Sequence, residues 1–228
     1  MNQMFDIYNN HHDLYDELVN HEDHKQHLTH FLRSEILWKN RSVIEFGMGT
    51  GRVTKMYIDL AKSALLYDNS AHMLQGAKEN LTPWIEKTSF RLLDNRDLNQ
   101  VQESADVVIQ GWSFGHLVVD NPQIMDHWIN HLVRESTRIA NQAVVFIETM
   151  GTNVTTPSPP TETLAYFYES LKKAGFTEHV LETDYLFEDY TQAARVMGAF
   201  FGEEMETDIL TQKKNQIPEF TGVWVCRA

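Results

Sequence analysis

Cysteine is almost absent from this sequence, because Cys226 is the only one among its 228 residues. A single thiol excludes an internal disulfide and any metal cluster built from cysteines. The sequence also lacks an apolar run near the roughly 18 residues that a membrane-spanning helix needs. Its first residues, Met-Asn-Gln-Met-Phe-Asp, contain no basic stretch followed by an apolar one, so no signal peptide is predicted. Together these absences favour a soluble cytoplasmic protein.

Positive charge is scarce as well. The chain has 19 basic against 32 acidic residues, which gives a formal net charge of -13, and its longest basic runs are the pairs at 172–173 and 213–214. Affinity for nucleic acid depends largely on basic contacts to phosphate, and anionic membranes attract polybasic segments. The composition therefore predicts that neither nucleic acid nor a membrane is a partner.

Short apolar segments alternate with amphipathic ones along most of the chain. The apolar segments predict strands at 42–46, 64–67, 90–93, 106–109, 143–147, 180–187 and 220–226. Helical spacing is found between them, for example at 161–174 and 190–201. This alternation predicts an α/β fold with a mostly parallel sheet covered by helices on both faces. We expect one domain, in which a helical N-terminal cap (1–40) belongs with the α/β part (41–228).

An acidic residue and alternating glycines end the first predicted strand, in the run Glu45-Phe46-Gly47-Met48-Gly49-Thr50-Gly51. Glycines let the backbone turn sharply and let a ligand approach it closely, and a helix that begins near Gly51 would direct free N–H groups at that ligand. The third glycine comes one residue early for a dinucleotide fingerprint, and no Gly-Lys-Ser/Thr follows for a phosphate loop. A carboxylate at Glu45 suits an ammonium group better than a pyrophosphate.

Acidic residues also follow the second and third predicted strands. Asp68 stands where a carboxylate can accept both hydroxyls of a ribose. Asp94 and Asn95 follow the third strand, where a carboxylate and a backbone N–H can bind the amino edge of an adenine. With Glu45, these residues predict a site for a nucleoside that carries an amino acid.

These segments resemble the motifs of the class I S-adenosylmethionine-dependent methyltransferases. Residues 45–52 are similar to the first motif of that superfamily, 68–74 to the second, 94–98 to the third and 105–109 to the fourth. Later segments, such as Gly111-Trp112-Ser113, resemble a poorly characterised bacterial branch of small-molecule type, but these segments say little about the substrate. The resemblance implies a Rossmann-like sheet of seven strands with the last antiparallel, S-adenosylmethionine as methyl donor, and S-adenosylhomocysteine as product.

The motifs and the resemblance together predict a set of cofactor-binding residues. They are Tyr15, Glu45, Gly47, Met48, Gly49, Gly51, Asp68, Asn69, Met73, Asp94, Asn95, Arg96, Gln110, Gly111 and Trp112. Tyr15 enters because Tyr15-Asp16 resembles a pair with which related enzymes close the cofactor pocket. The alternative for Tyr15 is simple packing.

Two residues are candidates for catalysis, His116 and Glu148. His116 follows the fourth strand and could act as a general base, since histidine titrates near neutral pH; it could equally cap a helix or pack. Glu148 could orient an amine or a hydroxyl, or bond only to local backbone. The predicted substrate contacts are Trp112, His116, Tyr166, Tyr185 and Arg195, and packing is the alternative for each.

Histidines gather near the start of the chain, with six in the first thirty residues. Zinc would need three or four converging ligands, so we favour a solvated helix face and predict no metal. The apolar stripe on helix 190–201 predicts a core face or the seam of a homodimer, with a substrate lid as the weaker alternative.

The predicted function is transfer of a methyl group from S-adenosylmethionine to a nitrogen or oxygen atom of a small-molecule acceptor. Two alternatives stay open. One is another reaction of S-adenosylmethionine, such as an intramolecular cyclisation. The other is a non-catalytic module that only binds the cofactor.

Overall fold

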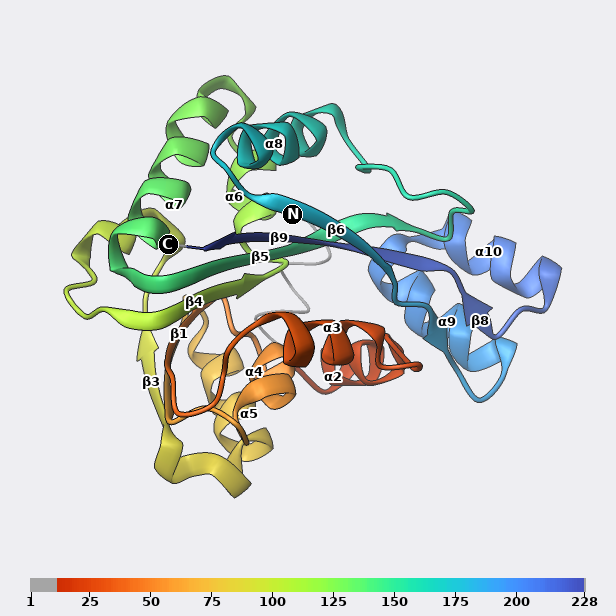
Figure 1. Ribbon diagram of the computed structural model, residues 1–228. Helices are drawn as coiled ribbons and strands as arrows, with labels where there is room; N and C mark the ends of the chain where they lie inside the picture. Colours follow the sequence, from red (N-terminus) through yellow and green to blue (C-terminus); the bar gives the residue numbers. More distant parts are fainter. Residues whose placement is uncertain (1–11, 228) are drawn as a thin grey trace.

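A seven-stranded sheet forms the centre of the computed structural model, which describes residues 12–227 (Figure 1). The strands lie in the order β3-β2-β1-β4-β5-β9-β6. Their bounds are β1 Ser42–Phe46, β2 Ser63–Asp68, β3 Thr88–Leu92, β4 Ala105–Gly111, β5 Ala140–Thr152, β6 Thr177–Glu182 and β9 Glu219–Arg227. Only β9 runs antiparallel to its neighbours β5 and β6. The predicted mostly parallel sheet with an antiparallel last strand is confirmed.

Helices cover both faces of the sheet (Figure 1). Below it in the view lie α3 (His27–Glu35), α4 (Arg52–Tyr57) and α5 (Ala71–Asn80); above it lie α6 (Phe114–Val119), α7 (Met125–Ile139) and α8 (Glu162–Lys173). Short 3-10 helices span Thr82–Lys87, Asn95–Gln100 and Pro122–Ile124. Three of the five residues of β1 are apolar because both faces of the strand are covered: Val43 packs into the core on the α4 side, and Ile44 into the core on the other side.

A lobe beside the sheet carries a third apolar core (Figure 1). It combines α2 (His12–His21), β7 (Tyr185–Leu186), α9 (Tyr190–Phe201), α10 (Glu203–Gln212) and β8 (Gln216–Ile217). Leu18 of α2 is buried in this core with Phe187 and Met197. The predicted N-terminal helices are thus present, with α2 in the lobe and α3 packed through Leu28 and Leu32 on the sheet.

The segment 180–187, predicted as one strand, is two strands. β6 ends at Glu182, and β7 leaves the large sheet to pair with β8. The break comes at Thr183 and Asp184: the Thr183 N–H donates to the Glu219 carbonyl, and Asp184 Oδ1 accepts from the Glu219 N–H at 3.1 Å. The prediction was wrong because these polar contacts to β9 turn the chain into the lobe.

Two of the N-terminal histidines bond to this segment. His21 Nδ1 lies 2.8 Å from the Leu186 carbonyl oxygen, and His27 Nδ1 lies 2.8 Å from that of Glu182. Both therefore hold the N-terminal helices against 182–186, so a purely solvated helix face was the wrong expectation for them. Among the helices of residues 12–227, none has the length and apolar character to cross a membrane.

Candidate active site

The turn between β1 and α4 has a backbone that glycine adopts most easily. Gly47 and Gly49 have φ angles of 60° and 56°, in the left-handed region that other residues rarely enter. A Cβ added at Gly47 would lie 2.2 Å from the Cβ of Ser113. Gly47 therefore leaves bare backbone at the wall of a cavity beside the turn.

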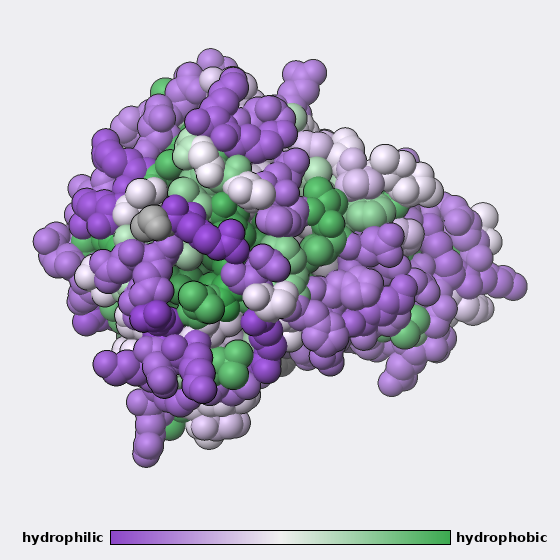
Figure 2. Space-filling view, viewed as in Figure 1, coloured by the Kyte–Doolittle hydropathy of each residue, from purple (hydrophilic) through white to green (hydrophobic). Residues whose placement is uncertain are grey.

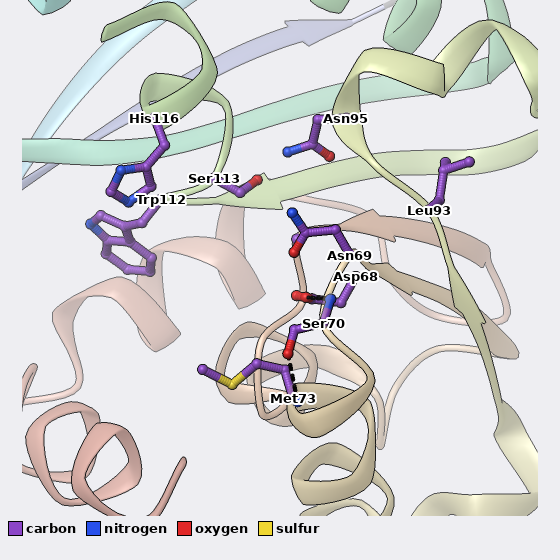
Figure 3. A pocket seen from close by; sticks show the side chains of 10 residues that line it. Asp68, Asn69, Ser70, Met73, Leu93, Asn95, Trp112, Ser113 and His116 are labelled. Atoms are coloured by element: carbon purple, nitrogen blue, oxygen red, sulfur yellow. Dashed lines mark hydrogen bonds between the residues drawn. The ribbon is translucent and has the colours of Figure 1, made fainter. Parts of the chain in front are cut away.

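This first cavity, of about 250 Å³, lies where the carboxyl ends of β1, β2 and β4 meet. It is lined by Gly47, Asp68, Asn69, Ser70, Met73, Leu93, Asn95, Trp112, Ser113 and His116. Figure 3 shows the residues that follow β2 gathered together, with Trp112 and His116 grouped on the segment after β4. The strand order reverses between the neighbouring strands β1 and β4, and ligands bind at such a position in open α/β sheets.

Asp68, the last residue of β2, both lines the first cavity and holds the glycine turn. Its Oδ2 accepts a hydrogen bond from the Gly49 N–H at 2.8 Å, and its Oδ1 accepts one from the Ser70 N–H at 2.9 Å. Burial raises the pKa of this carboxyl, and the backbone hydrogen bonds partly oppose that rise. Asp68 is thus placed where a carboxylate can accept ribose hydroxyls.

Glu45 lies under the turn rather than at the cavity wall. It is 1% exposed, and its Oε2 accepts hydrogen bonds from Thr54 Oγ1 at 2.7 Å and from Tyr57 OH at 2.6 Å. Its Oε1 accepts none from the described residues. Burial raises the pKa of Glu45 to about 7. Its contacts in the described chain are therefore with α4.

Asp94 is turned toward its own 3-10 helix. It pairs with Arg96 at 2.6 Å, and its Oδ1 accepts the Arg96 N–H at 2.9 Å. The guanidinium of Arg96 lowers the pKa of Asp94. Its neighbours Leu93 and Asn95, not Asp94 itself, line the first cavity. Of the three acids expected to converge, only Asp68 lies at the wall.

Two buried polar side chains hold the start of α6, Gln110 on β4 and Glu148 on β5. Gln110 Oε1 accepts the Ser113 N–H at 3.1 Å. Glu148 Oε1 accepts the Gly115 N–H at 2.8 Å and a hydrogen bond from Gln110 Nε2 at 3.1 Å. Burial raises the pKa of Glu148 to about 7. These side chains bond to protein groups, so they shape the segment 110–116.

That segment presents Trp112 and His116 to two cavities at once. Trp112 has a φ of 52°, and the guanidinium carbon of Arg52 lies 4.0 Å from the centre of its ring, a cation–π contact. Burial lowers the pKa of His116, while Asp120 partly opposes this. Near pH 7 the His116 imidazole is thus mainly neutral, the form that can accept a proton.

The second cavity, of about 470 Å³, lies between the lobe and the sheet. It is lined by Tyr15, Leu18, Val19, Glu22, Arg52, Trp112, His116, Thr149, Thr152, Pro160, Leu164, Tyr185, Phe200, Phe201, Met205 and Glu219. Most of this wall is apolar, and its charged residues are Glu22, Arg52 and Glu219. Figure 2 shows hydrophobic side chains exposed near the centre of this face within a mainly hydrophilic surface.

Tyr15 and Asp16 dock on the glycine turn. A Cβ added at Gly49 would lie 3.5 Å from the Tyr15 hydroxyl, and Asp16 accepts hydrogen bonds from Thr50 Oγ1 and from Asn80 Nδ2. Tyr15 lines the second cavity. The pair therefore joins α2 of the lobe to the turn, and its closing of a cofactor pocket stays a prediction.

The predicted site residues divide clearly by position. Those at the wall of the first cavity are Gly47, Asp68, Asn69, Met73, Asn95, Trp112 and His116; those at the second are Tyr15, Trp112, His116 and Tyr185. The predicted residues that line neither are Glu45, Met48, Gly49, Gly51, Asp94, Arg96, Gln110, Gly111, Glu148, Tyr166 and Arg195.

Two predicted substrate contacts lie on the surface. The Tyr166 hydroxyl donates to Asp126 Oδ1 at 2.8 Å, and its side chain is 40% exposed. Arg195 forms an ion pair with Glu17. Their helices were placed correctly, but each side chain projects from the outer face of its helix.

Sequence reasoning missed most of the second cavity. Leu18, Phe200 and Glu219 come from segments that meet only through the lobe, so no local motif marks them. In the first cavity, Ser70 and Ser113 lie within motifs that the sequence analysis did single out.

Comparison with known proteins finds a methyltransferase domain within the chain. Residues 43–135 match the family model of a methyltransferase domain. The fold is similar to a candidate methyltransferase of Bacillus halodurans (12% identity, 89% of this chain and 98% of that one, TM-score 0.58). It is also similar to the [4+2]-cyclase SpnF (14% identity, 88% of this chain and 80% of that one, TM-score 0.57). A third similar structure is a candidate RNA methyltransferase of Pyrococcus horikoshii (14% identity, 88% of this chain and 81% of that one, TM-score 0.54). No curated protein matches the sequence.

Residues 43–135 thus carry a methyltransferase domain, and the strand order agrees with the Rossmann-like fold of the solved methyltransferases that the chain resembles. The methyl donor of such domains is S-adenosylmethionine, which supplies a methyl group activated by positively charged sulfur. The residues of the first cavity fit this group: Asp68 offers a carboxylate for the ribose, Asn95 an amide for a polar edge of the base, and Leu93 an apolar contact.

Proposed function

We propose that this enzyme methylates a nitrogen or oxygen atom of a small molecule bound in the second cavity. The proposal rests on one observation: Trp112 and His116 line both cavities. A molecule in the second cavity would therefore meet the cofactor at this shared wall. The apolar side chains of Leu164, Phe200 and Met205 suit the body of such an acceptor.

For methyl transfer, the main task of the protein is to position the reacting groups and to exclude water. Orientation alone can lower a barrier by roughly 7–11 kcal/mol. Gln110 and Glu148 fix the 110–116 segment, so the shared wall is held rigidly. His116 is placed to take the proton that an amine or a phenol loses as it is methylated.

The overall charge supports a small acceptor over RNA. With a net charge of -13 the chain has little basic surface to offer phosphates, although the fold is shared with a candidate RNA methyltransferase. A location in the cytoplasm and a homodimeric state stay predictions.

The test is incubation with S-adenosylmethionine and a panel of small amines, phenols and RNA oligonucleotides. The products are identified by mass spectrometry. We expect a methylated small molecule together with S-adenosylhomocysteine. Methylthioadenosine formed without an acceptor would instead favour an intramolecular cyclisation. Tight cofactor binding with no transfer to any acceptor would favour a non-catalytic module.

A further inference from the structure

The second cavity contains a buried carboxylate that the cofactor site does not use. Glu219, the first residue of β9, is 2% exposed and lines this cavity. Its Oε1 accepts a hydrogen bond from Thr149 Oγ1 at 3.1 Å, and the side chain of Thr152 also interacts with the carboxylate, whereas its Oε2 accepts no hydrogen bond of normal geometry from the described residues. Burial with an unsatisfied oxygen is costly, so this atom is a position at which a ligand's hydrogen-bond donor would be stabilised.

The charges around Glu219 do not balance. Glu22 lies in the same wall and forms an ion pair with Arg52, with Glu22 Oε1 and Arg52 Nη2 2.8 Å apart. Tyr185 is also hydrogen-bonded to Glu22. Two carboxylates thus share one guanidinium, and Arg52 is already committed to Glu22 and to the ring of Trp112.

Burial and the nearby Glu22 raise the pKa of Glu219 well above its usual range, and Arg52 offsets this only in part. Burial thus disfavours the charged form of Glu219. A cation bound beside it would supply the missing positive charge and would allow Glu219 to ionise.

From this geometry we propose that the acceptor is an organic cation: an apolar body lies between Leu164, Phe200 and Met205, and a protonated amine binds Glu219 Oε2. This assignment rests on the proposed function for the role of the cavity. It goes further in naming the charge and the chemical group that the cavity selects.

The test uses three probes of the same shape and different charge: 2-phenylethylamine, 2-phenylethanol and 3-phenylpropionate. Their binding is measured by ligand-observed NMR titration at pH 7 with S-adenosylhomocysteine present. We expect the amine to bind about tenfold more tightly than the alcohol, which corresponds to one charge-assisted hydrogen bond, and the carboxylate to bind most weakly. Equal binding of the three probes, or preference for the carboxylate, would overturn the proposal.

The Glu219→Gln variant keeps an oxygen for Thr149 Oγ1 and removes the charge. It should bind the amine and the alcohol equally, whereas the matched variant Glu182→Gln, which removes an exposed carboxylate from the neighbouring strand β6, should keep the preference. A preference that survives in Glu219→Gln would refute the role of Glu219. If that variant does not fold, Glu219→Asp keeps the charge on a shorter side chain, and unchanged amine affinity there would equally refute it.

Calorimetry with S-adenosylhomocysteine, run on the same samples, separates this inference from the proposed function. If the wild-type protein does not bind S-adenosylhomocysteine, the methyltransferase site is refuted, while a measured preference for the amine still stands. Cofactor-product binding with no amine preference would keep the site and remove only the cationic acceptor.

Discussion

At the scale of single residues, Asp68 links the glycine turn to the first cavity. Its two oxygens accept hydrogen bonds from Gly49 and Ser70, and the same carboxylate lines the cavity wall. A single side chain thus holds the turn in shape and offers its remaining lone pairs to a ligand.

Replacing Asp68 with Asn should weaken the binding of S-adenosylhomocysteine by about tenfold or more. The amide keeps the size of the side chain but loses charge-assisted hydrogen bonds, each worth roughly 1.5–3 kcal/mol. Titration calorimetry gives the dissociation constant. Asp59→Asn, which changes an exposed carboxylate paired with Arg33, is the control and should bind normally. Unchanged affinity in Asp68→Asn would remove Asp68 from the cofactor site.

Replacing His116 with Asn should lower kcat for a phenol or amine acceptor by roughly 10²- to 10⁴-fold, the usual contribution of a general base. The pH profile of kcat should also lose the limb that reports the imidazole. Steady-state kinetics on an acceptor found in the panel provides the measurement. If kcat and its pH profile stay as in the wild type, His116 is only part of the wall.

Glu148 makes stability depend on pH. Burial disfavours the charged form and raises the pKa of the Glu148 carboxyl from its ordinary value of 4.5 to about 7. The folded state therefore holds an extra proton between these values. The resulting stability is complete below about pH 4.5 and is lost as the pH rises through about 7.

The variant Glu148→Gln should accordingly lose less stability between pH 5.5 and 8, by roughly 2 kcal/mol. Its amide oxygen can still accept the Gly115 N–H. Urea unfolding at the two pH values measures the difference, and Glu86→Gln, at an exposed position, serves as the control. An identical pH dependence in wild type and Glu148→Gln would show that Glu148 ionises normally.

Local sequence predicted the glycine turn and Asp68 because both depend on a few consecutive residues. It did not reveal which way the Glu45 side chain points, since side chains alternate along a strand. Val43 and Glu45 face α4, whereas Ile44 and Phe46 face the opposite core. The direction of Glu45 is thus set by the register of β1, which the motif alone does not specify.

At the scale of elements, the lobe joins the start of the chain to its last third. Leu18 of α2 is buried with residues of α9 and β7, while Leu28 of α3 is buried against the sheet. The two leucines lie on consecutive helices but stabilise different cores. They therefore provide a matched pair for testing whether the lobe opens as a unit.

Leu18→Ala should destabilise the lobe by roughly 2–5 kcal/mol, the usual cost of such a cavity. Hydrogen exchange should accelerate in α9, α10 and the β7–β8 pair and stay slow in β1 and β4. Leu28→Ala should destabilise the sheet side instead. Uniform acceleration over the whole chain in Leu18→Ala would mean that the lobe does not open separately.

The regular elements of the sheet were predictable, and those of the lobe were less so. The helix α8 follows from its apolar spacing and the glycine that ends it, and α9 from its apolar stripe. By contrast α10 is mostly polar, with Ile209 as its only buried residue, and β7 is two residues long. Such elements exist through contacts with distant segments, so periodicity does not reveal them.

At the scale of the whole molecule, the strand order follows from the alternation of elements and from the family motifs, but the second cavity does not. It forms only after α2, α9, α10 and β9 come together around Trp112. Its charged residues Glu22, Arg52 and Glu219 are far apart in sequence. Several residues at the wall of the first cavity could therefore be singled out from sequence, whereas the second cavity and its charged residues required the fold.

The net charge of -13 gives a prediction about partners that involves the entire surface. Nonspecific affinity for RNA comes from lysine and arginine contacts that displace counterions, and this chain has few such residues to group together. Filter binding with labelled RNA at low ionic strength should show no retention, while a basic RNA-binding protein measured in parallel is retained. Retention that falls steeply with added salt would reveal a phosphate-binding surface, and an acceptor on RNA would then have to replace the small molecule that we propose.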